Sequence, residues 1–220
     1  SIKGVNELKG IDVSVPGDPS SALFPIIAAL ICKNSDIIVK NVLINSTRDG
    51  AFRVLKNMGA DISFLNHRIM AAEEVYDIRV RSSSLRGVDV SRKSSPTMID
   101  DYPILAVAAS MAKGKTHFKG INELRFKESD RFTGIINLLE KNGVRVESKK
   151  DTIIIHGRCE LKKGGIEIKT NLDHRMAMSA LIMGLVSKKE IKIDNSETIK
   201  TSFPSFYKVM IKVGAKLSKK

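Results

Sequence analysis

Residues 130–144 read DRFTGIINLLEKNGV, and this stretch defines a unit that the chain uses three times. Its apolar residues recur with the period of an amphipathic helix. They are Phe132, Ile135, Ile136, Leu138 and Leu139. Gly143 follows where a left-handed residue commonly ends a helix. Two further amphipathic segments, Asp49–Met58 and Pro204–Val213, are also followed by glycine.

Three other segments are apolar on nearly every face, which predicts buried helices rather than surface helices. They are Ser21–Leu30, Ile104–Ala112 and Met176–Val186. Each precedes a strand pattern, and these patterns are Asp36–Leu43, Lys115–Ile121 and Glu190–Asp194. Further strand patterns are Asp61–Leu65, Tyr76–Arg81, Val88–Val90 and Val144–Glu147, and the third copy ends at Lys216–Ser218.

The repeated order is strand, buried helix, strand, amphipathic helix, then one or two strands. Because no linker separates the copies, we predict a single α/β (α+β) domain over residues 1–220 with pseudo-threefold symmetry. The buried helices are expected inside and the amphipathic helices outside.

Composition narrows the function classes. The chain has 37 Lys+Arg against 24 Asp+Glu, a net charge of +13, which suggests an anionic partner. Nucleic acid is disfavoured because the lysines are scattered, aromatic residues are 5% and tryptophan is absent. Small phosphorylated substrates remain a candidate class. No apolar run reaches the roughly 18–20 residues of a membrane span.

Cysteine and histidine give little sign of special chemistry. Cys32 and Cys159 lie far apart, so we expect two free, buried thiols and no disulfide framework. The four histidines show no ligand spacing with cysteines or carboxylates. The sequence therefore predicts neither a metal site nor a metal cofactor.

Polar residues gather where the predicted helices begin. Asp18, Asp49 and Asp130 are explained as caps or first-turn acids. Arg131 and Arg175 are harder to explain, because a cation near a helix N-terminus is unfavourable. Helix N-termini with added arginine or lysine form anion sites, so these positions suggest an anionic ligand.

At these residues the chain resembles the 5-enolpyruvylshikimate-3-phosphate synthase family of the shikimate pathway, the target family of glyphosate. The motifs KESDR and DHR, about 45 residues apart, are the most specific part of the resemblance. The matching stretches are Val15–Ala29, Ile99–Ala109, Leu124–Arg131, Asp173–Met178 and Thr201–Pro204. The resemblance runs from about Val5 to about Leu217.

The resemblance implies one half of a two-domain enolpyruvyl transferase fold, in which each domain has three βαβαββ units. This chain would be the C-terminal domain, with the N-terminal partner domain outside it. A short initial segment that completes the C-terminal domain in the family would also lie outside it.

The family moves the enolpyruvyl group of phosphoenolpyruvate to the 5-hydroxyl of shikimate 3-phosphate and releases phosphate, on the way to chorismate and the aromatic amino acids. It needs no metal or organic cofactor, and the implied location is the cytoplasm. Phosphoenolpyruvate, shikimate 3-phosphate and the N-terminal domain are therefore the implied partners, with no nucleic acid and no membrane. The isolated chain is expected to be inactive.

Residue roles follow from the resemblance position by position. Asp100 matches the carboxylate that contacts the shikimate hydroxyls and accepts a proton. Glu128 matches a carboxylate that shuttles a proton at the substrate methylene. Lys127 matches the lysine that binds shikimate 3-phosphate. Asp101 is interpreted as a helix-start acid without a substrate role.

The phosphoenolpyruvate site is implied by a second group. Arg131 and Arg175 match the arginines that hold its carboxylate, and His174 lies near the same site. Lys200 is a further candidate, although many relatives have this lysine one position later, where Thr201 stands here. Glu123 replaces a substrate-contacting asparagine of some relatives and is assigned no role.

Two alternatives stay open. A related transferase that uses a UDP-linked amino sugar shares the fold and phosphoenolpyruvate, although KESDR favours shikimate 3-phosphate. A non-catalytic basic domain that binds nucleic acid would instead show steeply salt-dependent DNA binding.

Overall fold

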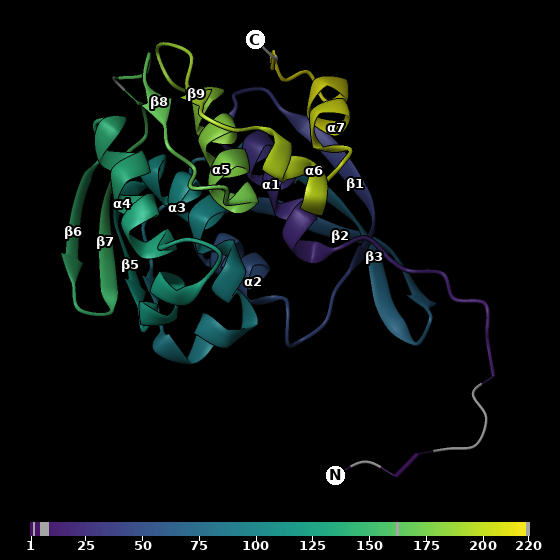
Figure 1. Ribbon diagram of the computed structural model, residues 1–220. Helices are drawn as coiled ribbons and strands as arrows, with labels where there is room; N and C mark the ends of the chain where they lie inside the picture. Colours follow the sequence, from purple (N-terminus) through teal and green to yellow (C-terminus); the bar gives the residue numbers. More distant parts are fainter. Residues whose placement is uncertain (2, 5–8, 162, 219–220) are drawn as a thin grey trace.

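The computed structural model describes residues 1, 3–4, 9–161 and 163–218. Three helix-and-strand units follow one another and pack around a common centre (Figure 1). The centre consists of α1 (Pro19–Ile31), α3 (Tyr102–Ser110) and α5 (His174–Gly184). These three helices contact one another, which confirms the predicted interior of buried helices.

The central helices are buried because their sequences offer no polar face. Every residue of α3 is buried, and the alanines at 106, 108 and 109 let its neighbours approach closely. In α1, all residues except Ser21 are buried. A helix without a polar face must be covered on all sides, so the three units bury one another's helices.

Each unit begins with a parallel strand contact that its central helix connects. Gly17 makes a parallel bridge to Val42 in β1 (Asp36–Leu43). In the second unit, β4 (Asp89–Val90) pairs with β5 (Lys113–Lys119). In the third, β8 (Glu167–Ile168) pairs with β9 (Lys192–Ile193).

An amphipathic helix then covers the outside of each unit. These helices are α2 (Gly50–Asn57), α4 (Arg131–Lys141) and α7 (Phe206–Lys212). The glycines that follow them, Gly59, Gly143 and Gly214, have φ values of 86°, 80° and 97°. This left-handed conformation confirms the predicted helix ends and explains why glycine is used there.

Antiparallel hairpins complete the first two units. The hairpin β2 (Asp61–Met70) and β3 (Glu73–Arg81) joins β1, with β3 in the middle. The hairpin β6 (Arg145–Lys149) and β7 (Thr152–Arg158) joins β5, with β7 in the middle. The sequence pattern placed neither β7 nor the second half of β2.

The third unit differs from the other two. An additional helix, α6 (Glu197–Ser202), precedes α7. Within the described residues, β9 pairs with β8 alone, so the third unit shows no strand equivalent to β3 and β7 of the other units. After α7 the chain continues through Gly214 to Ser218 without joining a sheet.

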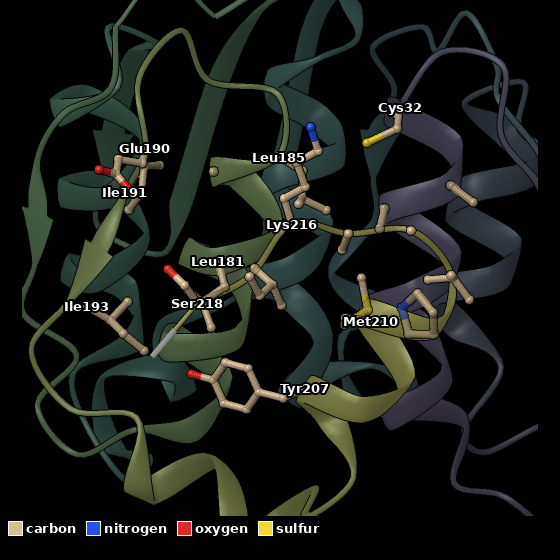
Figure 2. A pocket seen from close by; sticks show the side chains of 18 of the residues that line it. Cys32, Leu181, Leu185, Glu190, Ile191, Ile193, Tyr207, Met210, Lys216 and Ser218 are labelled. Atoms are coloured by element: carbon tan, nitrogen blue, oxygen red, sulfur yellow. The ribbon is translucent and has the colours of Figure 1, made fainter. Parts of the chain in front are cut away.

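A groove of about 690 Å³ lies between the third unit and the end of α1 in the first unit, next to the final segment of the chain. It is lined by Leu181 of α5, Leu185 directly after α5, Met210 of α7 and Ile193 of β9 (Figure 2). Cys32, which follows α1, lines the same groove. The groove thus runs beside the strand that lacks the second neighbour found in the other units.

The two thiols are free, as predicted, but the prediction that both are buried is wrong. Cys159 is exposed and has a positive φ of 59°, because it lies in the bend after β7. Cys32 is partly buried at the groove, and burial raises the pKa of its thiol. Within the described residues, no helix has the length and apolar character needed to cross a membrane.

Candidate active site

The candidate site forms where the starts of α3, α4 and α5 converge. Asp100 belongs to a 3₁₀ turn, Ile99–Asp101, that runs directly into α3. Lys127 and Glu128 lie between a second 3₁₀ turn, Asn122–Phe126, and α4. Arg175 lies in the first turn of α5. Three separate stretches of sequence therefore supply the site.

Arg131 is at the centre of this cluster and its side chain is fully buried. Its Nε donates to Asp173 Oδ2 at 2.8 Å, and its Nη1 donates to Asp100 Oδ1 at 2.9 Å. Its Nη2 donates to Glu128 Oε2 at 2.5 Å. A buried guanidinium needs such carboxylate partners, because an uncompensated charge is costly away from water.

Asp173 holds the start of α5 as well as Arg131. Its Oδ1 accepts from the backbone N–H groups of Arg175 and Met176, which makes it the helix cap. Its Oδ2 accepts from Ser129 at 2.9 Å. Burial alone would raise the pKa of Asp173, but the hydrogen bonds and charge of Arg131, together with the hydrogen bonds from Ser129 and Met176, lower it.

Asp173 belongs to the DHR motif, but the sequence alone assigns it no function. A carboxylic acid directly before an apolar helix is the usual signal of a cap, and that signal was present. Its second role, as the buried partner of Arg131, depends on a contact across 42 residues. No local pattern reports such a contact.

Asp100 is the most accessible acid that faces two cations of the cluster. Its side chain is 42% exposed, and Lys127 Nζ lies 3.5 Å from its Oδ1. Burial by itself would raise the pKa of Asp100, but the charges of Arg175, Lys127 and Arg131 lower it. The carboxylate is therefore ionised at neutral pH and ready to accept a hydrogen bond from a hydroxyl.

Lys127 is shared between two acids. Its Nζ lies 2.8 Å from Glu123 Oε1, closer than the 3.5 Å to Asp100. The hydrogen bond that Lys127 donates to Glu123 raises the pKa of Lys127, so its side chain is a charged ammonium group at neutral pH. Glu123, to which the sequence assigned no role, is therefore the nearest partner of the predicted substrate lysine.

Glu128 and Arg175 are the remaining charged members of the cluster: Glu128 pairs with Arg131, and Arg175 pairs with Asp101. The Glu128 side chain is 54% exposed, so the carboxylate bound to Arg131 can exchange with one from solvent. Arg175 is 16% exposed, and its Nη1 donates to the backbone oxygen of Asp100 at 3.1 Å. The same nitrogen donates to Asp101 Oδ1 at 3.2 Å.

Within the described residues, the side chains of His174 and Lys200 make no hydrogen bond or ion pair with this network, although His174 lies close enough to feel the charge of Arg131. His174 is partly buried, and burial together with the charge of Arg175 lowers its pKa below the usual 6.5. Lys200 lies in the last turn of α6. Its Nζ contacts Glu197 of the same helix at 2.5 Å, and within the described chain no ion pair joins it to the cluster.

The side chains of the cluster are acids and bases. Within the described residues, no group of three His, Cys, Asp or Glu side chains is arranged to hold a metal ion. The cluster instead alternates carboxylates with guanidinium and ammonium groups. Such a set can bind anions and exchange protons with a hydroxyl or an activated carbon.

Comparison with known proteins gives a consistent result. The family model for EPSP synthase (3-phosphoshikimate 1-carboxyvinyltransferase) matches residues 1–210. A 3-phosphoshikimate 1-carboxyvinyltransferase of Chelativorans sp. (strain BNC1) is 50% identical over 218 residues, covering 99% of this chain and 49% of that protein. The Paramagnetospirillum magneticum protein of that name is 48% identical, with the same coverage.

Solved structures agree. EPSP synthase from Acinetobacter baumannii superimposes with a TM-score of 0.91 at 37% identity, covering 97% of this chain and 50% of that one. The enolpyruvyl transferase NikO from Streptomyces tendae reaches a TM-score of 0.66 at 18% identity and so shares the fold. The chain spans about half the length of the curated relatives it matches.

Proposed function

This chain belongs to the EPSP synthase family, and we propose that it forms the C-terminal half of a 3-phosphoshikimate 1-carboxyvinyltransferase. That enzyme would transfer the enolpyruvyl group of phosphoenolpyruvate to the 5-hydroxyl of shikimate 3-phosphate, with release of phosphate. The observation that carries the proposal is the convergence of Asp100, Lys127, Glu128 and Arg175 around the buried Arg131.

Asp100 and Lys127 would serve the acceptor substrate. Asp100 is ionised and partly open to solvent, so it can accept the proton of the attacking hydroxyl. Lys127 carries a secure positive charge within 3.5 Å of that carboxylate and can bind the substrate phosphate. Both groups would then contact one molecule of shikimate 3-phosphate.

Glu128 would give a proton to the methylene carbon of phosphoenolpyruvate during addition and take one back during elimination. Its exposure of 54% places it where a ligand can reach it. Glu128 Oε2 accepts a hydrogen bond from Arg131 Nη2, so this contact must loosen before the carboxyl group can reach the methylene carbon. We therefore expect substrate binding to move Glu128 away from Arg131.

Arg175 and Arg131 would hold the carboxylate of phosphoenolpyruvate, but they differ in how accessible they are to a ligand. Arg131 is fully enclosed by Asp100, Glu128 and Asp173, whereas Arg175 retains 16% exposure. Arg175 is therefore the first contact for an incoming carboxylate. Arg131 becomes available when Glu128 exchanges with the ligand.

The third unit supports the proposal that residues 1–220 are one domain that another part of the enzyme completes. In the first two units, one strand of the hairpin pairs with the strand that follows the central helix: β3 pairs with β1, and β7 pairs with β5. The corresponding place in the third unit is the groove beside β9. We propose that an extended segment of the N-terminal half lies there.

The test is a turnover assay on the complete enzyme, meaning this chain joined to an N-terminal half in one polypeptide. Phosphate release from phosphoenolpyruvate should require shikimate 3-phosphate, and Asp100→Ala or Glu128→Gln should each lower kcat about a hundredfold or more. Asp36→Asn, which changes an exposed acid of β1, is the matched control and should leave kcat unchanged. Full activity of both site variants would refute the proposed roles, and use of a UDP-linked amino sugar instead would refute the acceptor.

A further inference from the structure

Asp101 is a buried acid that the roles proposed above do not use. It lies immediately before α3, and its side chain is 4% exposed. An acid in this position normally caps the helix, but the Asp101 side chain makes no capping hydrogen bond. Its place at the helix start matches the sequence interpretation, while its contacts require another explanation.

The partners of Asp101 come from the other two units. Its Oδ1 accepts from Arg175 Nη1 of α5 at 3.2 Å, and Ser20 of α1 donates a hydrogen bond to it. Ser20 is 3% exposed, and its hydroxyl oxygen accepts from Arg48 Nη2 at 3.1 Å. One carboxylate thus joins the starts of all three central helices.

The contact with Arg175 fixes one end of a guanidinium. Nη1 is held by two oxygens, Asp101 Oδ1 at 3.2 Å and the Asp100 backbone oxygen at 3.1 Å. Within the described part of the chain, the hydrogen bonds of this guanidinium all use Nη1, so Nη2 and Nε remain available to a ligand. A planar guanidinium held at one corner presents a defined edge to a carboxylate.

Arg131 offers a useful contrast. All three of its nitrogens are engaged by carboxylates, and it has no exposed surface. Arg175 is the guanidinium with an open edge, and Asp101 is the acid that sets the direction of that edge.

We propose that Asp101 is a positioning residue for phosphoenolpyruvate, orienting Arg175 so that its open edge receives the substrate carboxylate. This inference rests on the proposed function. The functional part of Asp101 is its acceptor oxygen, because its negative charge would itself repel an anionic substrate. A side chain that keeps the oxygen and loses the charge should therefore work.

Two substitutions separate the oxygen from the charge. Asp101→Ala removes the acceptor, and Asp101→Asn keeps an oxygen at the same distance from the backbone. In the complete enzyme, Asp101→Ala should lower kcat/KM for phosphoenolpyruvate about tenfold or more, because misplaced binding groups lose rate steeply. KM for shikimate 3-phosphate should stay within about twofold, and Asp101→Asn should restore kcat/KM to within about threefold of the wild type.

Asp77→Ala is the matched control. Asp77 is also a buried acid paired with an arginine, Arg68 at 2.7 Å, but it lies in β3 away from the candidate site. It should lower the melting temperature and leave kcat/KM for phosphoenolpyruvate unchanged. A loss in Asp101→Ala at a melting temperature no lower than that of Asp77→Ala is then specific to substrate positioning.

Three results would overturn the inference. They are wild-type kinetics in Asp101→Ala, equal losses in Asp101→Ala and Asp101→Asn, and equal changes in KM for both substrates. Absence of turnover in the wild-type enzyme would instead refute the proposed function. The failure of the two claims is therefore distinguishable.

Discussion

The Nε of Arg131 and the Oδ2 of Asp173 lie 2.8 Å apart, and neither side chain has any exposed surface. The bond joins the first turn of α4 to the cap of α5, so it ties the second unit to the third. It also places Arg131 where Asp100 and Glu128 reach its other two nitrogens. The pair thus fixes the position of the guanidinium group to which the other acids of the candidate site bind.

Removing the charge of Asp173 should destabilise the chain strongly. Asp173→Asn keeps an oxygen for the helix cap but leaves the buried Arg131 short of a counter-charge, which typically costs about 3–5 kcal/mol. Urea unfolding of this chain and of the variant measures the difference. Asp36→Asn, which breaks an exposed pair with Arg79, should cost only about 0–1 kcal/mol. A loss of less than about 1 kcal/mol in the free energy of unfolding of Asp173→Asn would contradict the structural role of the pair.

Asp101 should make stability fall as pH rises through the mildly acidic range. Burial raises its pKa in the folded chain to about 6, above the ordinary 3.8. The folded state therefore holds this proton more tightly than the unfolded state does. The protonated Asp101 contributes fully to the free energy of unfolding below pH 4, and this contribution is lost as pH rises toward 6.

Asp101→Asn has no such proton to lose. Its free energy of unfolding, measured relative to the wild type, should increase by about 2–3 kcal/mol between pH 4 and pH 6. Urea unfolding of both proteins at several pH values gives this difference. A difference that is flat with pH would show that the Asp101 pKa is not raised.

The two cysteines provide an internal test of the groove. Cys32 lines the groove and is partly buried, whereas Cys159 lies exposed after β7. If a segment of the N-terminal half fills the groove, alkylation of Cys32 should be at least about tenfold slower in the complete enzyme than in this chain. Alkylation of Cys159 should be unchanged. Equal rates for Cys32 in both proteins would contradict the proposed filling.

This chain alone should not turn over substrate. It carries the Asp100, Glu128 and Arg175 cluster, but under the proposal the N-terminal half supplies further contacts to shikimate 3-phosphate. Phosphate release should be undetectable with the chain alone and should return when an N-terminal half is added. Shikimate 3-phosphate-dependent release by the chain alone would show that the second half is dispensable.

Much of the fold could be predicted because its signals are local. The apolar helices and the glycines after α2, α4 and α7 are visible in the sequence, and the structure confirms them. The strand β7 was missed although its first four residues, Thr152–Ile155, are all β-branched, which is a local strand signal. The helix α6 was missed because six residues with mixed polarity give no clear period.

The sequence predicted which residues would lie near one another, but not how they pair, and their roles in catalysis and binding stay predictions. The motifs identified Asp100, Lys127, Glu128, Arg131 and Arg175, and the structure places them in one cluster. Their pairing was not predictable, because Arg131 meets Asp173 across 42 residues and Arg175 meets Asp101 across 74. Asp101 was interpreted as a helix-start acid, and Glu123 was given no role because it replaces an asparagine of some relatives. Their ion pairs with Arg175 and Lys127 are visible only in the folded chain.

The most direct test of the central claim is to follow the carbon skeleton of phosphoenolpyruvate. The complete enzyme would be mixed with ¹³C-labelled phosphoenolpyruvate and shikimate 3-phosphate, and the products examined by NMR. We predict that the label appears as an enolpyruvyl ether on the 5-hydroxyl of shikimate 3-phosphate, with one phosphate released for each ether formed. Label that stays in phosphoenolpyruvate, or appears only as pyruvate, would contradict the account.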